Sequence, residues 1–199
     1  MKILITGNQG YVGPAVAARL RASRPGAVLA GFDIGYYAGC TTGPEASPEG
    51  LPHIQYRGDM RLFPESVLDG VDAVVHLAAI SNDPIGNRFE DATLDINHRA
   101  SVALARAARA AGVRAFVFAS SCSMYGAAED APRTEEAPLN PLTAYARSKV
   151  LTERDLRPLG APGFRITSLR FSTACGWSER LRLDLVLNEQ RIYVYRAGI

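Results

Sequence analysis

Tyr145 and Lys149, in the stretch YARSK, form a pair of side chains that could take and return a proton. Residues four positions apart lie on one face of an α-helix, so the phenol and the ammonium can point into one site. A free tyrosine titrates near pH 10, and a neighbouring cation lowers its pKa because it favours the phenolate. Only 2 of the 22 basic residues are lysine, which strengthens the case for a special role of Lys149. The alternative is a surface tyrosine beside a solvated lysine.

A second stretch with chemical potential is TGNQGYVG, residues 6–13, which comes after a short apolar run. Glycine between a strand and a helix permits either a tight turn or the close approach of a phosphate to the backbone. In dinucleotide-binding units an acidic residue about 20 positions further on holds the ribose hydroxyls. Asp33 stands 20 residues beyond Gly13. This context favours a phosphate site over a plain turn, although the glycine spacing differs from G-x-G-x-x-G.

Asp33 also predicts which dinucleotide binds. A carboxylate at this place hydrogen-bonds the ribose hydroxyls of NAD and repels the 2′-phosphate of NADP. No basic residue follows Asp33 until Arg57, so the sequence indicates no cation near a 2′-phosphate. NAD is therefore the expected cofactor, and we expect NAD to stabilise the protein more than NADP does.

Several serines lie in FASSCSMYG, residues 118–126, at the end of an expected strand. Ligands of open α/β sheets bind beyond the carboxyl ends of the strands. A serine there can hydrogen-bond the substrate oxygen that Tyr145 deprotonates. The alternative for Ser120 and Ser123 is that their hydroxyls satisfy the backbone of a turn.

Short apolar runs that alternate with longer helical segments must position these residues. The expected strands are Lys2–Thr6, Val28–Asp33, Ile54–Asp59, Ala73–Leu77, Ala115–Ser120 and Ile166–Phe171. The expected helices are Tyr11–Arg24, Thr93–Ala111 and Thr143–Leu156, with Pro14 in a first turn, where proline is tolerated. This alternation predicts an α/β fold with a doubly wound parallel sheet of the Rossmann type. Residues 35–52 read as a surface loop, and RIYVYR near the end alternates like a strand.

Composition excludes several classes of protein. The chain has 199 residues and a formal charge of +2, which does not favour nucleic acid or a membrane surface as a partner. No apolar run approaches the roughly 20 residues that span a bilayer, and no signal-peptide pattern is present. Cys40, Cys122 and Cys175 have no spacing typical of a disulfide framework or a metal site. We therefore expect a cytoplasmic protein without a metal.

The sequence resembles the extended short-chain dehydrogenase/reductases of the NAD-dependent epimerase/dehydratase family, which act on nucleotide sugars. The matching motifs occur in family order over nearly the whole chain: TGNQGYVG, GFD at 31–33, RGDM at 57–60, HLAA at 76–79, DIN at 95–97, SSCSMYG at 120–126, YARSK at 145–149 and LR at 169–170.

The resemblance implies a role for each matching residue. The catalytic residues would be Ser121, Tyr145 as the base, and Lys149. The residues that bind the cofactor would be Gly7, Gly10, Tyr11, Val12, Gly13, Asp33, Asp59, Met60, Leu77, Ala78, Ala79, Asn97, Tyr145 and Lys149. Within this set the three glycines would hold the pyrophosphate, Asp33 the adenosine ribose, and Asp59 and Met60 the adenine. Asn97 would also brace the active-site helix, and His76 is expected to be a core residue. The substrate would contact Ser121, Ser123 and Asn188.

The chain also departs from the family pattern. Sugar dehydratases of the family place Asp-Glu directly after the catalytic Thr, whereas Cys122 and Ser123 come after Ser121 here, so dehydration is not expected. FSTACG, after the Leu-Arg pair, lacks an Asn that many members use for a nucleotide-sugar contact. We expect residues 1–171 to form the NAD-binding domain and residues 172–199 to begin an incomplete C-terminal substrate lobe. A chain of this length is then expected to bind NAD, to bind nucleotide sugars weakly and to turn over slowly.

Three functions remain open at this stage. The leading one is an NAD-dependent nucleotide-sugar epimerase that oxidises a sugar carbon transiently and reduces it again. The second is a dehydrogenase or reductase with net redox turnover, and the third is a catalytically silent NAD-binding protein. The resemblance further implies a homodimer that packs through the helices Thr93–Ala111 and Thr143–Leu156.

Overall fold

Six parallel strands form one sheet in the computed structural model, which describes residues 1–37, 39–41, 50–81, 83–127, 132–180 and 182. The strands lie in the order β3-β2-β1-β4-β5-β6. Their bounds are β1 Lys2–Thr6, β2 Val28–Asp33, β3 Ile54–Arg57, β4 Ala73–His76, β5 Ala115–Ser121 and β6 Arg165–Phe171. The chain begins in the middle of the sheet and winds outward in both directions, which confirms the predicted doubly wound fold.

The strand prediction holds to within two residues at each end. The largest difference is β3, which ends at Arg57 instead of Asp59. The Gly58 N–H still bonds to the carbonyl of Asp33, but the chain turns at Asp59, whose carboxylate accepts from the Arg61 N–H to cap a short 3₁₀ helix. The charged end of the expected strand therefore belongs to a turn.

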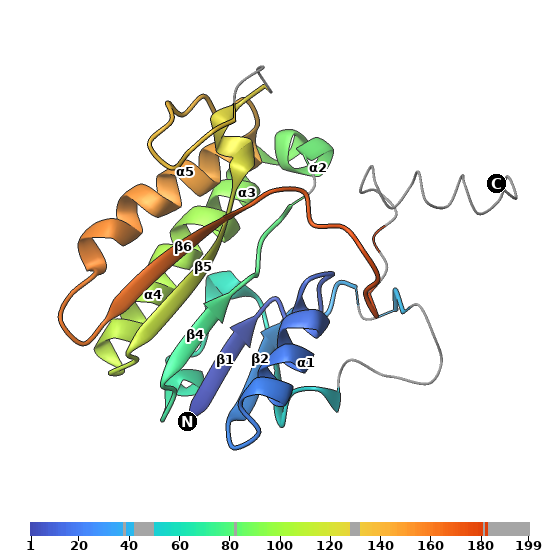
Figure 1. Cartoon of the computed structure of the whole chain (residues 1–199), viewed down its shortest axis with the longest axis vertical. Coiled ribbons are helices and arrows are strands. Elements are labelled where there is room, and N and C mark those ends of the chain that lie inside the picture. Colours follow the sequence, from blue (N-terminus) through green and yellow to red (C-terminus); the bar gives the residue numbers. More distant parts are fainter. Residues whose placement is uncertain (38, 42–49, 82, 128–131, 181, 183–199) are drawn as a thin grey trace, which may run out of the picture.

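Helices cover both faces of the sheet (Figure 1). The α-helices are α1 Gly13–Ser23, α2 Asp83–Arg88, α3 Glu90–Leu94, α4 Ala100–Ala110 and α5 Ala144–Leu156, and 3₁₀ turns span Met60–Leu62, Glu65–Leu68, Cys122–Tyr125 and Arg157–Leu159. On one face Ile3 and Ile5 pack with Ala17 of α1. On the other, Leu4 belongs to a larger core with Leu104 of α4. Adjacent residues of β1 thus face opposite helices, as an unbroken apolar strand requires.

The predicted helix Thr93–Ala111 is not continuous. A π-helical turn, Asp95–Arg99, separates α3 from α4. Its centre is the buried Asn97, whose backbone carbonyl accepts hydrogen bonds from the hydroxyls of Ser101 and Thr152. These side chains engage a carbonyl that a regular helix would use internally, and π-turns of this kind are frequent at functional sites.

The outer edge of the sheet is the part with the least cover among the described residues. On β6, Leu169 is 41% exposed and Phe171 is 40% exposed. Their partners in β5 are Ala119 and Ser121, which are only half-buried. Within the part of the chain that the structure describes, no helix covers this face of β5 and β6. Asn188 and the RIYVYR stretch lie outside the described residues, as do residues 38 and 42–49 of the expected 35–52 loop.

Candidate active site

The loop between β1 and α1 contains three glycines that are needed for different reasons. Gly7 has a φ of 72°, and a Cβ there would lie 2.5 Å from the backbone nitrogen of Ala78. A Cβ on Gly13 would lie 2.1 Å from the carbonyl oxygen of Asn8. Gly10 differs, since among the described residues its Cβ would meet only the Gly7 carbonyl oxygen, at 3.3 Å. Packing of the protein itself requires Gly7 and Gly13, whereas at Gly10 a Cβ would meet one close contact and otherwise point toward the ligand-binding edge of the sheet.

The N-terminus of α1 lies next to this part of the loop. Its N-cap residue, Val12, offers no side chain to the first N–H groups, and no acidic residue stands in the first turn. Pro14 stands in the first turn, as predicted. Such an end carries a partial positive charge and backbone donors, which suit a phosphate. The loop from Gly10 to Gly13 is therefore built to receive an anion.

Alanine at Gly10 and alanine at Gly13 are expected to fail in different ways. Gly13→Ala forces Asn8 out of place and should destabilise the fold by about 1–3 kcal/mol or more. Gly10→Ala should cost clearly less stability than Gly13→Ala and weaken NAD binding about tenfold or more, because its methyl group occupies the ligand's space. Urea denaturation and NAD titration of both variants check this. Equal losses of stability would contradict the assignment of Gly10 to the ligand.

Asp33 ends β2 and ties it to the glycine loop. Its carboxylate accepts from the Gln9 N–H at 2.9 Å and from the Gly35 N–H at 2.8 Å. The expectation that no cation lies near Asp33 is wrong. Arg57 is its partner in the β2–β3 register, although 24 positions separate the two in sequence. Parallel pairing brings the two strand ends to the same edge of the sheet.

The residues expected beside the adenine are largely occupied by the protein. The Asp59 carboxylate pairs with the guanidinium of Arg61, and this hydrogen bond lowers the pKa of Asp59. The side chain of Met60 is buried in the larger core. Leu77, Ala78 and Ala79 come directly after β4 and are half-buried, close to the glycine loop. Any contact of Met60 with a ligand must therefore come from its backbone.

Tyr145 and Lys149 lie on one face of α5, as their spacing predicted. The helix begins at Ala144, and its N-cap Thr143 accepts from the Ala146 N–H at 3.1 Å. The Lys149 Nζ atom is 5.3 Å from the centre of the Tyr145 ring and 4.7 Å from that of Phe118. It donates to the carbonyl of Ala119, in β5, at 2.7 Å. This bond fixes the lysine at the carboxyl end of the sheet.

Burial changes the charge state of Lys149. Its side chain is 2% exposed, and desolvation lowers the pKa of the ammonium to about 7, while the carboxylate of Glu153 acts in the opposite direction. Arg170 holds that carboxylate at 2.7 Å. Near neutral pH the lysine is therefore a mixture of ammonium and amine, rather than the permanent cation that the sequence indicated.

The hydroxyls of the three serines at the end of β5 differ in their hydrogen-bond partners. The Ser121 hydroxyl accepts from the Ser123 N–H at 3.2 Å and caps the turn Cys122–Tyr125. The hydroxyl oxygens of Ser120 and Ser123 are buried and have no hydrogen-bond partner among the described residues. The turn-satisfying role proposed for Ser120 and Ser123 thus falls to Ser121. A buried hydroxyl without a partner costs free energy, so Ser120 and Ser123 are the serines in need of a ligand.

Asn97 links the loop after β4 to α5. Its side chain accepts from the N–H of Ile80 at 2.7 Å and donates to the Ile80 carbonyl at 2.9 Å. The same amide donates to the Ser148 hydroxyl, which donates in turn to the carbonyl of Tyr145. The π-turn therefore helps to hold Tyr145 in place. Sequence reasoning assigned no role to Ser148 or Ile80, although Ser148 lies within the YARSK stretch, because their contacts with Asn97 join distant parts of the chain.

His76 is a core residue, in agreement with the sequence-based interpretation. It is 1% exposed and lies between the hydroxyls of Thr6 and Ser101, at 2.6 and 2.7 Å. Burial, together with the charge of Lys149, lowers its pKa to about 3. The imidazole is neutral at physiological pH and joins the glycine loop to α4.

A segment after β6, residues 176–180, crosses back over the sheet to the glycine loop (Figure 1). The Tyr11 hydroxyl donates to the Gly176 carbonyl, and the Ser178 hydroxyl donates to the Tyr11 carbonyl, both at 2.6 Å. Arg180 is almost fully buried and forms a β-bridge with Thr41. We call this segment the strap. Its contacts join residues more than 130 positions apart, so no local pattern could reveal them.

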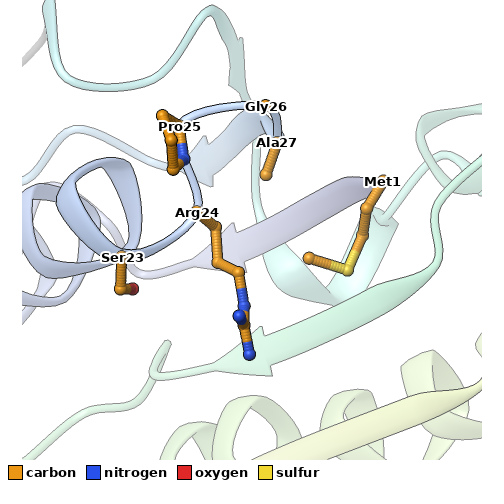
Figure 2. Close-up of a pocket in the computed structure, with 6 residues that line it drawn as sticks. All are labelled: Met1, Ser23, Arg24, Pro25, Gly26 and Ala27. Atoms are coloured by element: carbon orange, nitrogen blue, oxygen red, sulfur yellow. The ribbon is translucent and has the colours of Figure 1, made fainter.

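Other kinds of site are not found among the described residues. They contain no group of three or more His, Cys, Asp or Glu side chains that could hold a metal ion. No described helix is long and apolar enough to cross a membrane. A hollow lined by Met1 and residues 23–27 lies between the end of α1 and the start of β1, at the opposite end of the sheet from the glycine loop (Figure 2).

Comparison with known proteins gives consistent matches. The model of the family described as NAD dependent epimerase/dehydratase matches residues 3–185. The chain is 33% identical to the UDP-glucose 4-epimerase of Streptomyces lividans over 189 residues, which cover 92% of this chain and 55% of that enzyme. A solved NAD-dependent NDP-hexosamine 5,6-dehydratase of tunicamycin biosynthesis superposes with a TM-score of 0.82 at 28% identity, over 98% of this chain and 61% of the dehydratase.

A second solved structure, MoeE5 in complex with UDP-glucose and NAD, has a TM-score of 0.79 at 28% identity. The match covers 95% of this chain and 59% of MoeE5. This chain spans about half the length of the curated relatives that it matches.

Proposed function

Because the chain belongs to the NAD-dependent epimerase/dehydratase family, we propose that it acts as a nucleotide-sugar epimerase. NAD is the cofactor of this family. The observation that carries the proposal is the placement of the glycine loop and of the Tyr145–Lys149 pair at the same edge of the sheet. Phosphate-binding and proton-transfer groups thus face a common region, where open α/β sheets bind their ligands.

The residues at this edge fit a dinucleotide. The uncapped start of α1 and the open side of Gly10 suit the pyrophosphate, and Asp33 suits the ribose hydroxyls. Lys149 and Tyr145 would lie at the nicotinamide end, and Leu77–Ala79 between the two ends. When bound, NAD supplies hydride acceptance and return, which is the redox half of the chemistry.

The acid–base half belongs to this chain's own residues. We assign to Tyr145 the role of acid and base: its phenolate takes the proton of the sugar hydroxyl as the carbon is oxidised and returns the proton afterwards. Lys149 lies against the Tyr145 ring, and its ammonium form favours the phenolate. The hydroxyl of Ser121 would bond the same sugar oxygen, and that of Ser123, which has no partner among the described residues, would bond a neighbouring one.

Epimerisation is preferred to dehydration because the two residues after Ser121 are not acids. Expelling water from a sugar needs an acid close to the leaving oxygen, and Cys122 and Ser123 occupy the positions where such acids are expected. The carboxylate of Glu153 is already held by Arg170. The described part of the site therefore favours moving a hydride out and back over losing water.

The test is to incubate the protein with NAD and a panel of UDP- and dTDP-hexoses in D₂O. An epimerase that oxidises and reduces the same carbon converts one sugar into its epimer, forms no net NADH at 340 nm and incorporates no carbon-bound deuterium. Net NADH would indicate a dehydrogenase. An NAD-dependent melting shift without conversion of any sugar would indicate a silent NAD-binding protein. Either of these results would overturn the proposal.

We also propose that two copies pair through α4 and α5. The outward face of α4 exposes Ala103 and Ala110, whose small side chains permit close helix packing. Ala103→Arg should then convert a dimer into a folded monomer in sedimentation equilibrium. Ala18→Arg, at an exposed alanine of α1, is the matched control and should remain dimeric. A wild-type protein that is monomeric at high concentration would refute the pairing.

A further inference from the structure

Asp33 and Arg57 stand side by side at the ribose end of the site. They are partners in the parallel β2–β3 register, at the last residue of each strand. Only Asp33 belongs to the expected ribose site, and Arg57 has no role assigned to it there. Because both strand ends lie at the ligand-binding edge of the sheet, an arginine here adds a cation next to the carboxylate that discriminates between NAD and NADP.

Gly35 brings the two charged groups to one place. Its N–H donates to the Asp33 carboxylate at 2.8 Å. A Cβ on Gly35 would lie 3.2 Å from the Nη1 atom of Arg57. Gly35 has a φ of 78°, which other residues rarely adopt, so no side chain at this position separates the guanidinium from the carboxylate. The Arg57 side chain is exposed.

The carboxylate is also less available than a free aspartate. Two backbone N–H groups, from Gln9 and Gly35, already donate to its two oxygens. These two donors offset part of its negative charge and weaken its repulsion of a phosphate. Arginine is well suited to phosphate because its planar fork can donate two parallel hydrogen bonds.

We infer that Arg57 is a specificity-determining residue, which lets the site accept the 2′-phosphate of NADP as well as the ribose hydroxyls of NAD. Asp33 still favours NAD, but Arg57 narrows the preference for NAD over NADP by about tenfold, the effect of one charge-assisted hydrogen bond. The inference rests on NAD being the cofactor and does not depend on epimerase activity.

The test is to measure the dissociation constants of NAD and NADP by calorimetry for the wild type and for Arg57→Ala. The variant should bind NAD within about threefold of the wild type and bind NADP about tenfold more weakly. Its remaining NADP affinity should depend less on salt, because one cation–phosphate contact is gone. Arg19→Ala removes the same charge from an exposed position of α1 and should change neither constant.

Three results would overturn the inference: no measurable NADP binding by the wild type, equal weakening of both ligands by Arg57→Ala, or no effect of that variant on NADP. Arg57→Gln serves as a second variant if alanine lowers the melting temperature, and it must show the same selective loss. Asp33→Asn tests the carboxylate instead of the cation and should weaken the binding of NAD more than that of NADP. Because every readout is binding, a protein that epimerises no sugar would leave these outcomes unaffected.

Discussion

Tyr145→Phe is expected to abolish epimerisation, by about 10³-fold or more, while NAD binding changes by less than about twofold. The substitution removes only the phenolic oxygen, which we propose accepts the proton of the sugar hydroxyl. It keeps the ring that packs beside the Lys149 ammonium. Conversion of sugar should be measured with protein in excess over substrate, so that a slow single turnover is visible. NAD affinity is measured in parallel by titration.

Tyr56→Phe is the matched control for this experiment. Tyr56 lies in β3, where its half-buried ring packs against the larger core, away from α5. This variant should keep both activity and affinity. If Tyr145→Phe retained most of whatever turnover the protein shows, the proposed acid–base chemistry would be wrong, even with NAD binding intact.

Lys149 is expected to lower the stability of the fold and to be necessary for NAD binding and for the reaction rate. Lys149→Arg should weaken NAD binding about tenfold and lower the rate about 100-fold or more, because a guanidinium cannot take the position of Nζ between the Ala119 carbonyl and the Phe118 ring. An arginine also cannot give up its proton, as a lysine with a pKa of about 7 can. The charge must then stay buried.

Lys149→Met should stabilise the protein, most strongly at neutral pH. Burial lowers the folded pKa of Lys149 to about 7 from its ordinary value of 10.5, so the unfolded chain binds more protons between these two values. The free energy of unfolding of the wild type therefore rises with pH over this window. The cost of burying the charged ammonium is fully present below about pH 7. Each unit that separates the two pKa values corresponds to about 1.4 kcal/mol, so the advantage of the methionine amounts to several kcal/mol.

Urea denaturation at pH 7, 8, 9 and 10 checks this prediction. The stability difference between Lys149→Met and wild type should shrink steadily as the pH rises. Lys2 is the other lysine of the chain, and its ammonium lies at the surface on the Asp69 carbonyl, so Lys2→Met is the control and should show no such trend. A pH-independent difference at Lys149 would show that its burial carries no charge penalty.

Much of the fold could be predicted because strands and turns carry local signals. The apolar run of β1, the glycines after it and Asp33 at the end of β2 identified the first βαβ unit from its sequence alone. The Tyr145–Lys149 spacing likewise placed both side chains on one helical face. Each of these inferences uses residues close together in the chain.

The parts that escaped prediction depend on contacts between distant segments. Arg57 becomes the neighbour of Asp33 only when β3 pairs with β2. The π-turn at Asn97 requires Thr152, 55 positions later, to bond its carbonyl. Likewise, Ser121 rather than Ser120 or Ser123 caps its turn, because the strand continues one residue further than its pattern indicated.

The strap has a consequence for exchanging parts between relatives. Gly176 and Ser178 belong to the segment that we expected to begin the substrate lobe. Ser178 donates to the carbonyl of Tyr11, and the carbonyl of Gly176 accepts from the Tyr11 hydroxyl, directly beside the loop that suits the pyrophosphate. A chimera joined directly after Phe171 would pair the glycine loop with a foreign strap. A junction placed after Arg180 keeps Gly176, Ser178 and the bridge to Thr41 with the loop that they support. The better junction for a chimera therefore lies after the strap rather than at the end of β6.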